Sequence, residues 1–219
     1  MELVPLMPTL FLIRHGENDY LKKNKMPGRL PGIHLNTRGL EQAGELAQTL
    51  GSLPIKALYS SPLERAVETA RPLAQCLGLE IRVCPDLSDT DVGLWEGRSW
   101  KVLGRTKLWK VVQQTPSQFQ FPGGETFVQA QERVVNSLDA IASAHGDELI
   151  AVVFHADPIK LAVAHYLGLP LDNFQRLTTQ TGSVTILKMD GSAAKILAIN
   201  LIPPFSFPKA QDNKTPGKV

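Results

Sequence analysis

The sequence predicts an α/β fold, a three-layer α/β/α sandwich in which a mostly parallel central sheet lies between two layers of helices. Strand-like and helix-like segments alternate along most of the 219 residues, which is typical of this class. Residues 149–154 (LIAVVF) form a continuous apolar run, as expected of a strand buried on both faces. The hydrophobic fraction of 43% supplies enough apolar side chains for the core of such a sandwich.

The expected elements follow from local composition and spacing. Short apolar or β-branched runs predict strands over residues 9–13, 57–59, 80–83, 149–154, 183–187 and 195–201. Apolar spacing, start signals and terminal glycines predict helices over residues 37–50, 62–77, 126–145 and 157–168. Strands and helices in this order place any ligand beyond the carboxyl ends of the strands.

Three of the helices have recognisable start signals. Ser61 is expected as an N-cap, and Glu64 three residues later completes a capping box. Thr126 and Gln129 form a second capping box, and Asp157 is expected to cap the last helix. The first turns after Ser61 and Asp157 therefore present backbone N–H groups that could bind an anion.

Charge and hydropathy exclude several function classes. The net charge is +2, and the basic residues are scattered without a run of five or six, so we expect no nucleic-acid partner. The apolar start of the chain lacks a basic region and a cleavage site, and no later segment is long enough to span a bilayer. We therefore expect a cytoplasmic protein with no membrane partner, and we leave a homodimer open.

The chain has no internal repeat, and we expect a single domain over residues 1–202. Residues 203–219 are rich in proline and polar side chains, which predicts an extended or disordered tail. The two cysteines, Cys76 and Cys84, have no metal-ligand spacing, and we expect two buried thiols.

Two predicted strands end in histidine: LIRHG places Arg14 and His15 after the first strand, and VVFHAD places His155 after the fourth. Arg65 lies just inside a capped helix that follows another strand. Guanidinium groups match phosphate oxygens in pairs, and a phosphate dianion needs a cationic cluster of this kind. The four residues therefore predict a phosphate site at the carboxyl edge of the sheet.

Several motifs carry a resemblance to a known family. The segments RHGEN (14–18), SSPLERAVETA (60–70), LSDTDVGLWEG (87–97), PGGET (122–126) and the histidine at 155 occur in this order. Together they resemble the histidine phosphatase superfamily, also called the phosphoglycerate mutase-like family, over about residues 11–190. The resemblance implies a phosphoglycerate mutase-like fold.

The resemblance also implies roles for individual residues. His15 would be the nucleophile and become phosphorylated, while Arg14, Arg65 and His155 would surround the transferred phosphoryl group. The acidic proton donor of the family, usually glutamate, falls on Asp89. We expect no metal and no cofactor, since this chemistry requires neither and no metal-ligand spacing is visible.

The sequence departs from the family pattern at three positions near the site. Asp89 is one methylene shorter than the usual glutamate, which leaves Asp91 and Glu96 as competitors, although Glu96 is expected to be a structural hydrogen-bonding partner. Leu21 stands where many members have an asparagine that touches the phosphoryl group. Asn18 could supply a compensating amide, or it could shape the loop.

Three functions remain open at this level. The first is a phosphomonoesterase acting on a small phosphorylated metabolite. The second is a cofactor-dependent phosphoglycerate mutase, disfavoured because only 24 residues separate Gly97 from Pro122, without a long Arg-rich insertion. The third is a catalytically silent phospho-ligand-binding protein, disfavoured because the nucleophile and its cations are all present. Substrate choice is expected to depend on residues 98–121 and 26–34, where Arg29 is either a further anion contact or solvated.

Overall fold

The computed structural model describes residues 7–206 and has a six-stranded central sheet with the order β3-β2-β4-β1-β5-β6. Strands β1 to β4 are parallel to one another, and β5, near one edge, is antiparallel to both of its neighbours, β1 and β6. The strands are β1 (Thr9–Arg14), β2 (Ile55–Ser60), β3 (Ile81–Val83), β4 (Leu149–Phe154), β5 (Val184–Asp190) and β6 (Ala193–Leu201). The predicted α/β fold with a mostly parallel sheet is confirmed.

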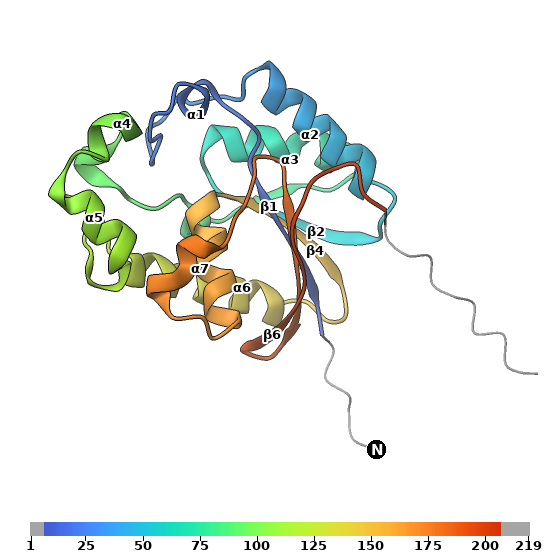
Figure 1. Cartoon of the computed structure of the whole chain (residues 1–219). Coiled ribbons are helices and arrows are strands. Elements are labelled where there is room, and N and C mark those ends of the chain that lie inside the picture. The colour runs from blue at the N-terminus through green and yellow to red at the C-terminus, as the bar shows by residue number, and fades with distance from the viewer. Residues whose placement is uncertain (1–6, 207–219) are drawn as a thin grey trace, which may run out of the picture.

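Helices cover both faces of the sheet (Figure 1). They are α1 (Asp19–Lys22), α2 (Thr37–Leu50), α3 (Glu64–Leu77), α4 (Trp100–Leu103), α5 (Lys107–Gln114), α6 (Phe127–Ser143) and α7 (Ala156–Tyr166). Helices α2 and α3 pack on one face of the sheet through Leu46, Leu50 and Leu73. Helices α6 and α7 pack on the other face through Leu138 and Ile159. The two cores explain why β1 and β4 are apolar on both faces.

A third apolar cluster lies outside the sandwich, under α4 and α5. Trp95, Phe119, Phe121 and Phe127 are almost fully buried there, with ring centroids 4.9–6.2 Å apart. Aromatic pairs at these distances stabilise the cap that α4 and α5 form beside the sheet. Neither helix is predicted from the sequence, because α4 has only four residues and α5 eight.

Most of the expected helix boundaries are confirmed, and two starts are corrected. Helix α2 has the predicted bounds, and α6 begins with the Thr126 capping box. Helix α3 begins at Glu64 and not after Ser61, because the Ser61 hydroxyl contacts the His155 ring, with Oγ 2.7 Å from Nε2. Helix α7 begins at Ala156, with His155 and not Asp157 as its N-cap residue.

Three other expectations concern the periphery of the fold. Within residues 7–206, no helix has the length and apolar character needed to cross a bilayer. The expectation of two buried thiols is wrong, since Cys76 is exposed on α3 and Cys84 is partly buried. Of the predicted tail, residues 207–219 lie outside the described residues, while Phe205 packs against the core that α2 and α3 cover.

Candidate active site

The site lies at the carboxyl edge of the two central strands, β1 and β4. These strands are parallel neighbours with Arg14 opposite Phe154, so the residues that follow them, His15 and His155, emerge side by side. The backbone N–H of His15 donates to the Phe154 carbonyl oxygen at 3.0 Å, and the two imidazole rings have centroids 5.1 Å apart. Sheet pairing therefore brings together histidines that are 140 positions apart in the sequence.

The loop after β1 holds the His15 ring in one orientation. His15 Nδ1 lies 2.7 Å from the Gly16 carbonyl oxygen, which can only accept, so Nδ1 carries the proton and Nε2 has a free electron pair. Gly16 is required by close packing, since a Cβ atom there would lie 2.6 Å from the Gly39 carbonyl oxygen. Its N–H also donates to Thr69 Oγ1 at 2.9 Å, which ties the loop to α3.

Both histidines are buried, and their pKa values are lowered well below the ordinary value. Burial has the largest effect, because it penalises the charged imidazolium, and the positive charges of Arg65 and Arg14 add to it. Both rings are therefore neutral near pH 7. A neutral imidazole with a free Nε2 pair is the form of histidine that can attack phosphorus.

Two arginines lie beside the histidines and are partly satisfied by the backbone. Arg65, fully buried on α3, donates from Nη2 to the Gly28 carbonyl oxygen at 2.7 Å and to Asp89 Oδ2 at 3.0 Å. Arg14 donates from Nη1 to the Thr179 carbonyl oxygen at 2.7 Å. These bonds hold each guanidinium in place while leaving other N–H groups uncommitted.

A buried nitrogen without a hydrogen-bond partner occurs in each of the three residues expected to surround the phosphoryl group and in Asn18, the possible compensating amide. These atoms are Arg14 Nε, Asn18 Nδ2, Arg65 Nε and Nη1, and His155 Nδ1. A buried donor without an acceptor costs about 1–3 kcal/mol, so a cluster of them is unusual in a protein core. An anion with several acceptor oxygens would satisfy the whole set.

Asp89 is the carboxylate that faces this cluster. Its Oδ2 accepts from Arg65, and its Oδ1 accepts from the Thr90 N–H at 2.9 Å. Burial raises the pKa of Asp89 and nearby Asp157 raises it further, against the opposing charge of Arg65. A carboxyl group with a raised pKa is suited to hold a proton and donate it.

The competing carboxylates have other partners. Asp91 Oδ1 accepts from the Gly93 N–H at 3.0 Å, and Glu96 Oε1 accepts from the Arg29 N–H at 2.7 Å. Among the described residues that line the pocket at His15, Asp89 is present and neither Asp91 nor Glu96 is. The geometry therefore favours Asp89, and Glu96 has the structural hydrogen bond expected of it.

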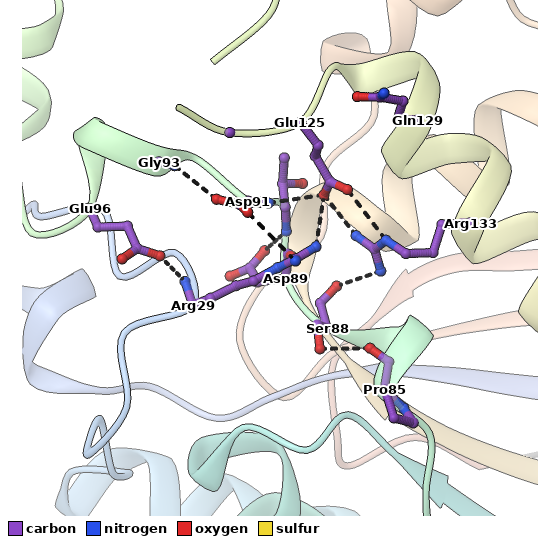
Figure 2. Close-up of polar contacts among 12 residues, drawn as sticks. Arg29, Pro85, Ser88, Asp89, Asp91, Gly93, Glu96, Glu125, Gln129 and Arg133 are labelled. Atoms are coloured by element: carbon purple, nitrogen blue, oxygen red, sulfur yellow. Dashed lines mark hydrogen bonds and ion pairs between the residues drawn. The ribbon is translucent and has the colours of Figure 1, made fainter. Parts of the chain in front are cut away.

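An ion-pair network supports the segment that contains Asp89 (Figure 2). Glu125 accepts from Arg29 Nη2 at 3.1 Å, from Arg133 Nη2 at 2.8 Å and from the Asp91 N–H at 2.9 Å. Arg29 also donates from Nε to the Asp89 carbonyl oxygen at 2.7 Å. Arg29 is therefore partly exposed and links Glu125 to the Asp89 backbone, and it is not among the described residues that line the pocket at His15.

The pocket at His15 combines predicted and unpredicted residues. Leu21 lines it directly, while Asn18 is fully buried and caps α1 by accepting from the Leu21 N–H at 3.0 Å. Ala156 and Asp157 at the start of α7 line it as well, but the first turn of α3 does not. No group of three or more His, Cys, Asp or Glu side chains within residues 7–206 is placed to hold a metal ion.

Sequence reasoning missed the partners that orient the site residues. Ser61 contacts His155, and Thr179 supplies the carbonyl oxygen that holds Arg14. Ser61 is hidden in the sequence because a serine before proline is also a common N-cap pattern. Thr179 contributes its backbone carbonyl oxygen, so the identity of its side chain does not indicate this contact in the sequence.

Fold and site together define an α/β protein with a mostly parallel sheet and a candidate site at two strand-end histidines. The chain belongs to the histidine phosphatase superfamily (branch 1), whose family model matches residues 10–202. The resemblance noted from the motifs is therefore confirmed.

Named relatives include phosphatases and a mutase. Phosphoserine phosphatase 1 of Hydrogenobacter thermophilus is 28% identical over 200 residues, which covers 89% of this chain and 93% of that protein. The 2,3-bisphosphoglycerate-dependent phosphoglycerate mutase of Thermoplasma acidophilum is 30% identical over 196 residues, covering 90% and 94%. The solved structure of Bacillus stearothermophilus YhfR superposes with a TM-score of 0.83 at 26% identity, covering 89% of this chain and 98% of that one.

Proposed function

We propose that this chain is a phosphomonoesterase that hydrolyses a small phosphorylated metabolite through a phosphohistidine on His15. One observation carries the proposal: His15, with Nε2 free, lines one pocket together with Asp89 and Arg14. Arg65 and His155, each with a buried nitrogen that lacks a hydrogen-bond partner, adjoin this pocket, since Arg65 bonds to Asp89 and the His155 ring lies 5.1 Å from the His15 ring. Names of phosphatases among the relatives support the same reaction. The geometry supports the following roles for individual residues.

In the first step, the Nε2 electron pair forms a bond to phosphorus while the bond from phosphorus to the leaving oxygen breaks. Asp89, whose pKa burial raises, gives a proton to that oxygen, and the product alcohol leaves. The uncommitted N–H groups of Arg14 and Arg65 neutralise the phosphoryl oxygens in the transition state.

In the second step, water attacks the phosphohistidine. The Asp89 carboxylate takes a proton from the water, a new oxygen–phosphorus bond forms, and the nitrogen–phosphorus electron pair returns to Nε2. Phosphate leaves, and both His15 and Asp89 are restored to their starting protonation states. The step requires neither a metal nor a cofactor.

A mutase is the second candidate, favoured by one of the named relatives. The match covers 94% of the length of that mutase, so chain length does not distinguish the mutase from this chain. The short segment between Gly97 and Pro122 therefore does not decide between a phosphatase and a mutase. The pocket favours the phosphatase instead. Arg14 is the one Lys or Arg among its described lining residues, so a second phosphate of a bisphosphate would lack its own cation there.

The test is a phosphatase screen over small phosphoesters with a chelator present. We expect turnover by the wild type, loss of at least about a thousandfold in His15→Ala, and wild-type activity in the matched control His165→Ala, an exposed histidine. Turnover that persists in His15→Ala would contradict the mechanism, and inactivity on every ester would favour the silent phospho-ligand-binding protein. Rapid interconversion of 3- and 2-phosphoglycerate with added 2,3-bisphosphoglycerate would favour the mutase.

A further inference from the structure

Beyond the phosphoryl-binding donors, the mouth of the pocket is lined by apolar side chains. They are Leu21, Met26, Pro27, Val92 and Trp100. Trp100 is 44% exposed, although it is one of the largest apolar side chains in the chain. A large aromatic side chain left exposed beside a catalytic pocket marks a surface that a ligand can cover.

These apolar side chains form one wall of the pocket, called the apolar wall below. The backbone builds it from two segments that are far apart in the sequence. Met26 donates its N–H to the Arg98 carbonyl oxygen at 2.9 Å and accepts from the Gly97 N–H at 2.7 Å. Trp100 donates its N–H to the Asn24 carbonyl oxygen at 2.9 Å. Because these bonds pair residues 24–26 with residues 97–100, the Met26 and Trp100 side chains are held by main-chain structure.

Packing also fixes the Trp100 ring from behind. Its indole lies edge-on to that of Trp109 on α5, with centroids 6.4 Å apart, and Trp109 in turn lies 6.0 Å from the buried Trp95. The aromatic cluster under α4 and α5 thus supports the apolar wall. An apolar group that enters the pocket would therefore meet a surface that is already ordered.

The aspartates at the mouth of the pocket already form ion pairs with basic side chains of the protein. Asp157 Oδ1 lies 2.6 Å from Lys160 Nζ, and Asp89 Oδ2 lies 3.0 Å from Arg65 Nη2. Arg14, the one Lys or Arg among the described lining residues, belongs to the phosphoryl site. A carboxylate on the leaving group would find no free cation there to offset its loss of hydration.

Two lysines close to Met26 in the sequence line a different hollow. Lys23 and Lys25 lie there with Tyr20 and His34, and Lys25 Nζ is 5.9 Å from the centre of the Tyr20 ring. They are not among the described residues at the mouth of the catalytic pocket. The apolar wall is therefore the main contact offered to the leaving group.

We infer that the alcohol part of the substrate is an aryl or alkyl group that packs against Trp100 and Met26, without a carboxylate or second phosphate. This inference rests on the proposed phosphatase function and narrows its substrate class.

The test compares three esters with similar primary alkoxide leaving groups: 3-phenylpropyl phosphate, 4-(phosphonooxy)butanoate and 3-aminopropyl phosphate. Because their intrinsic reactivities are close, differences in kcat/KM report contacts to the alcohol part. We expect 3-phenylpropyl phosphate to exceed the other two by about 100-fold. Equal or better turnover of the carboxylate or amine ester would overturn the inference.

Substitutions at Trp100 test whether the preference for an apolar alcohol part comes from the apolar wall. We expect Trp100→Ala to lower the ratio of kcat/KM for 3-phenylpropyl over methyl phosphate about tenfold, and Trp100→Phe to restore most of it. Val102→Ala, on the same helix but outside the pocket lining, should leave that ratio unchanged. A ratio that is unchanged in Trp100→Ala would contradict the assigned contact.

Binding separates failure of the inference from failure of the proposed function. If the wild type hydrolyses none of the esters, the phosphatase proposal fails, and non-hydrolysable phosphonates then test the pocket alone by calorimetry. We expect 4-phenylbutylphosphonate to bind about 100-fold more tightly than 5-phosphonopentanoate. The reverse order, or no binding of either, would overturn the inference whatever the turnover.

Discussion

The hydrogen bond between His15 Nδ1 and the Gly16 carbonyl oxygen decides which ring nitrogen can react. Because Nδ1 donates, Nε2 keeps its electron pair, and burial keeps the ring neutral. In His155, Nε2 contacts the Ser61 hydroxyl, while Nδ1 makes no hydrogen bond but lies 3.5 Å from Asp89 Oδ2. Two neighbouring histidines can therefore have different roles, nucleophile for His15 and hydrogen-bond donor for His155.

Asp89→Asn tests the proposed proton donor. An alkyl ester needs a proton on its leaving oxygen, so kcat for alkyl phosphates should fall by about 10²–10⁴-fold. Formation of the phosphoenzyme from p-nitrophenyl phosphate should be much less affected, because p-nitrophenolate leaves without a proton. Rapid-quench measurement of both product bursts checks this difference.

Asp91→Asn is the matched control for that experiment. Its carboxylate accepts from the Gly93 N–H and is not among the described pocket residues, so the dependence on the leaving group should match the wild type. An equal loss on both esters in Asp89→Asn would contradict a role in proton donation.

The chemistry-bearing residues could be predicted from the sequence because each lies in a motif at a strand end or helix start. His15, His155, Arg14 and Arg65 converge as expected. The residues that orient them could not be predicted, since they act through carbonyl oxygens or, like Ser61, fit an ordinary capping pattern. Orientation depends on tertiary contacts that no local pattern encodes.

At the scale of elements, Arg29, Glu125 and Arg133 join the loop after α1, the start of α6 and the Asp89 segment. Arg133 also donates to the Ser88 carbonyl oxygen at 3.1 Å, next to Asp89. Figure 2 shows both arginines pointing at the Glu125 carboxylate. The network thus positions the backbone on both sides of the proposed proton donor.

Glu125→Gln tests this positioning role. Losing the negative charge leaves two arginines without their shared partner, so we expect a loss of about 1–2 kcal/mol in the free energy of unfolding. The value of kcat for alkyl phosphates should fall about tenfold, and KM should change little. Glu132→Gln, an exposed neighbour on α6, is the control. Loss of stability with an unchanged kcat would indicate a purely structural role.

Two glycines on α2 make a matched pair. A Cβ atom on Gly39 would lie 2.1 Å from the Glu17 carbonyl oxygen in the loop after His15, whereas one on Gly44 would meet no atom within 4 Å. Gly39→Ala should therefore destabilise the fold by about 1–3 kcal/mol. Gly44→Ala should stabilise it by about 0.5–1 kcal/mol. Denaturant unfolding measures both, and equal effects would refute the close-packing argument.

Long periodic elements were predictable, and short ones were not. The bounds of α2 and β4 agree with the apolar spacing of their sequences. Helices α4 and α5 have only four and eight residues, so the periodic signal in their sequences is short. The segments 98–121 and 26–34 were expected to govern substrate choice, and Trp100 and Met26, which line the pocket, come from them. That these two side chains form one apolar wall depends on tertiary contacts and was not predicted.

At the scale of the whole molecule, the sandwich was predictable but the strand order was not. Alternating strands and helices indicate a parallel sheet, yet β4 lies between β1 and β2 although it follows them by about 90 residues or more in sequence. That insertion creates the site, because it is what places His155 beside His15.

The buried neutral histidines make stability depend on pH. Their pKa values are lowered in the folded state, so below about pH 6.5 the unfolded chain binds more protons than the folded chain. The contribution of the two histidines to the free energy of unfolding is therefore present above about pH 6.5. It is lost as the pH falls, by up to about 1.4 kcal/mol per pH unit for each histidine. Asp89, whose pKa is raised, has the opposite effect, since its proton favours the folded state at acidic pH.

Denaturant unfolding between pH 7.5 and 5.5 measures this dependence. His15→Asn should lose about half of the histidine contribution to the slope, while His165→Asn, an exposed histidine, should keep the wild-type slope. An unchanged slope in His15→Asn would contradict burial of a neutral ring at this position.

The central claim is that the phosphoryl group is transferred to His15. The direct measurement is mass spectrometry of alkaline-quenched Asp89→Asn protein after mixing with p-nitrophenyl phosphate, because this variant should accumulate the intermediate. We expect one acid-labile phosphoryl group per chain on the peptide that contains His15. A phosphoryl group on His155 or another residue, or turnover without any phosphorylated protein, would contradict the account.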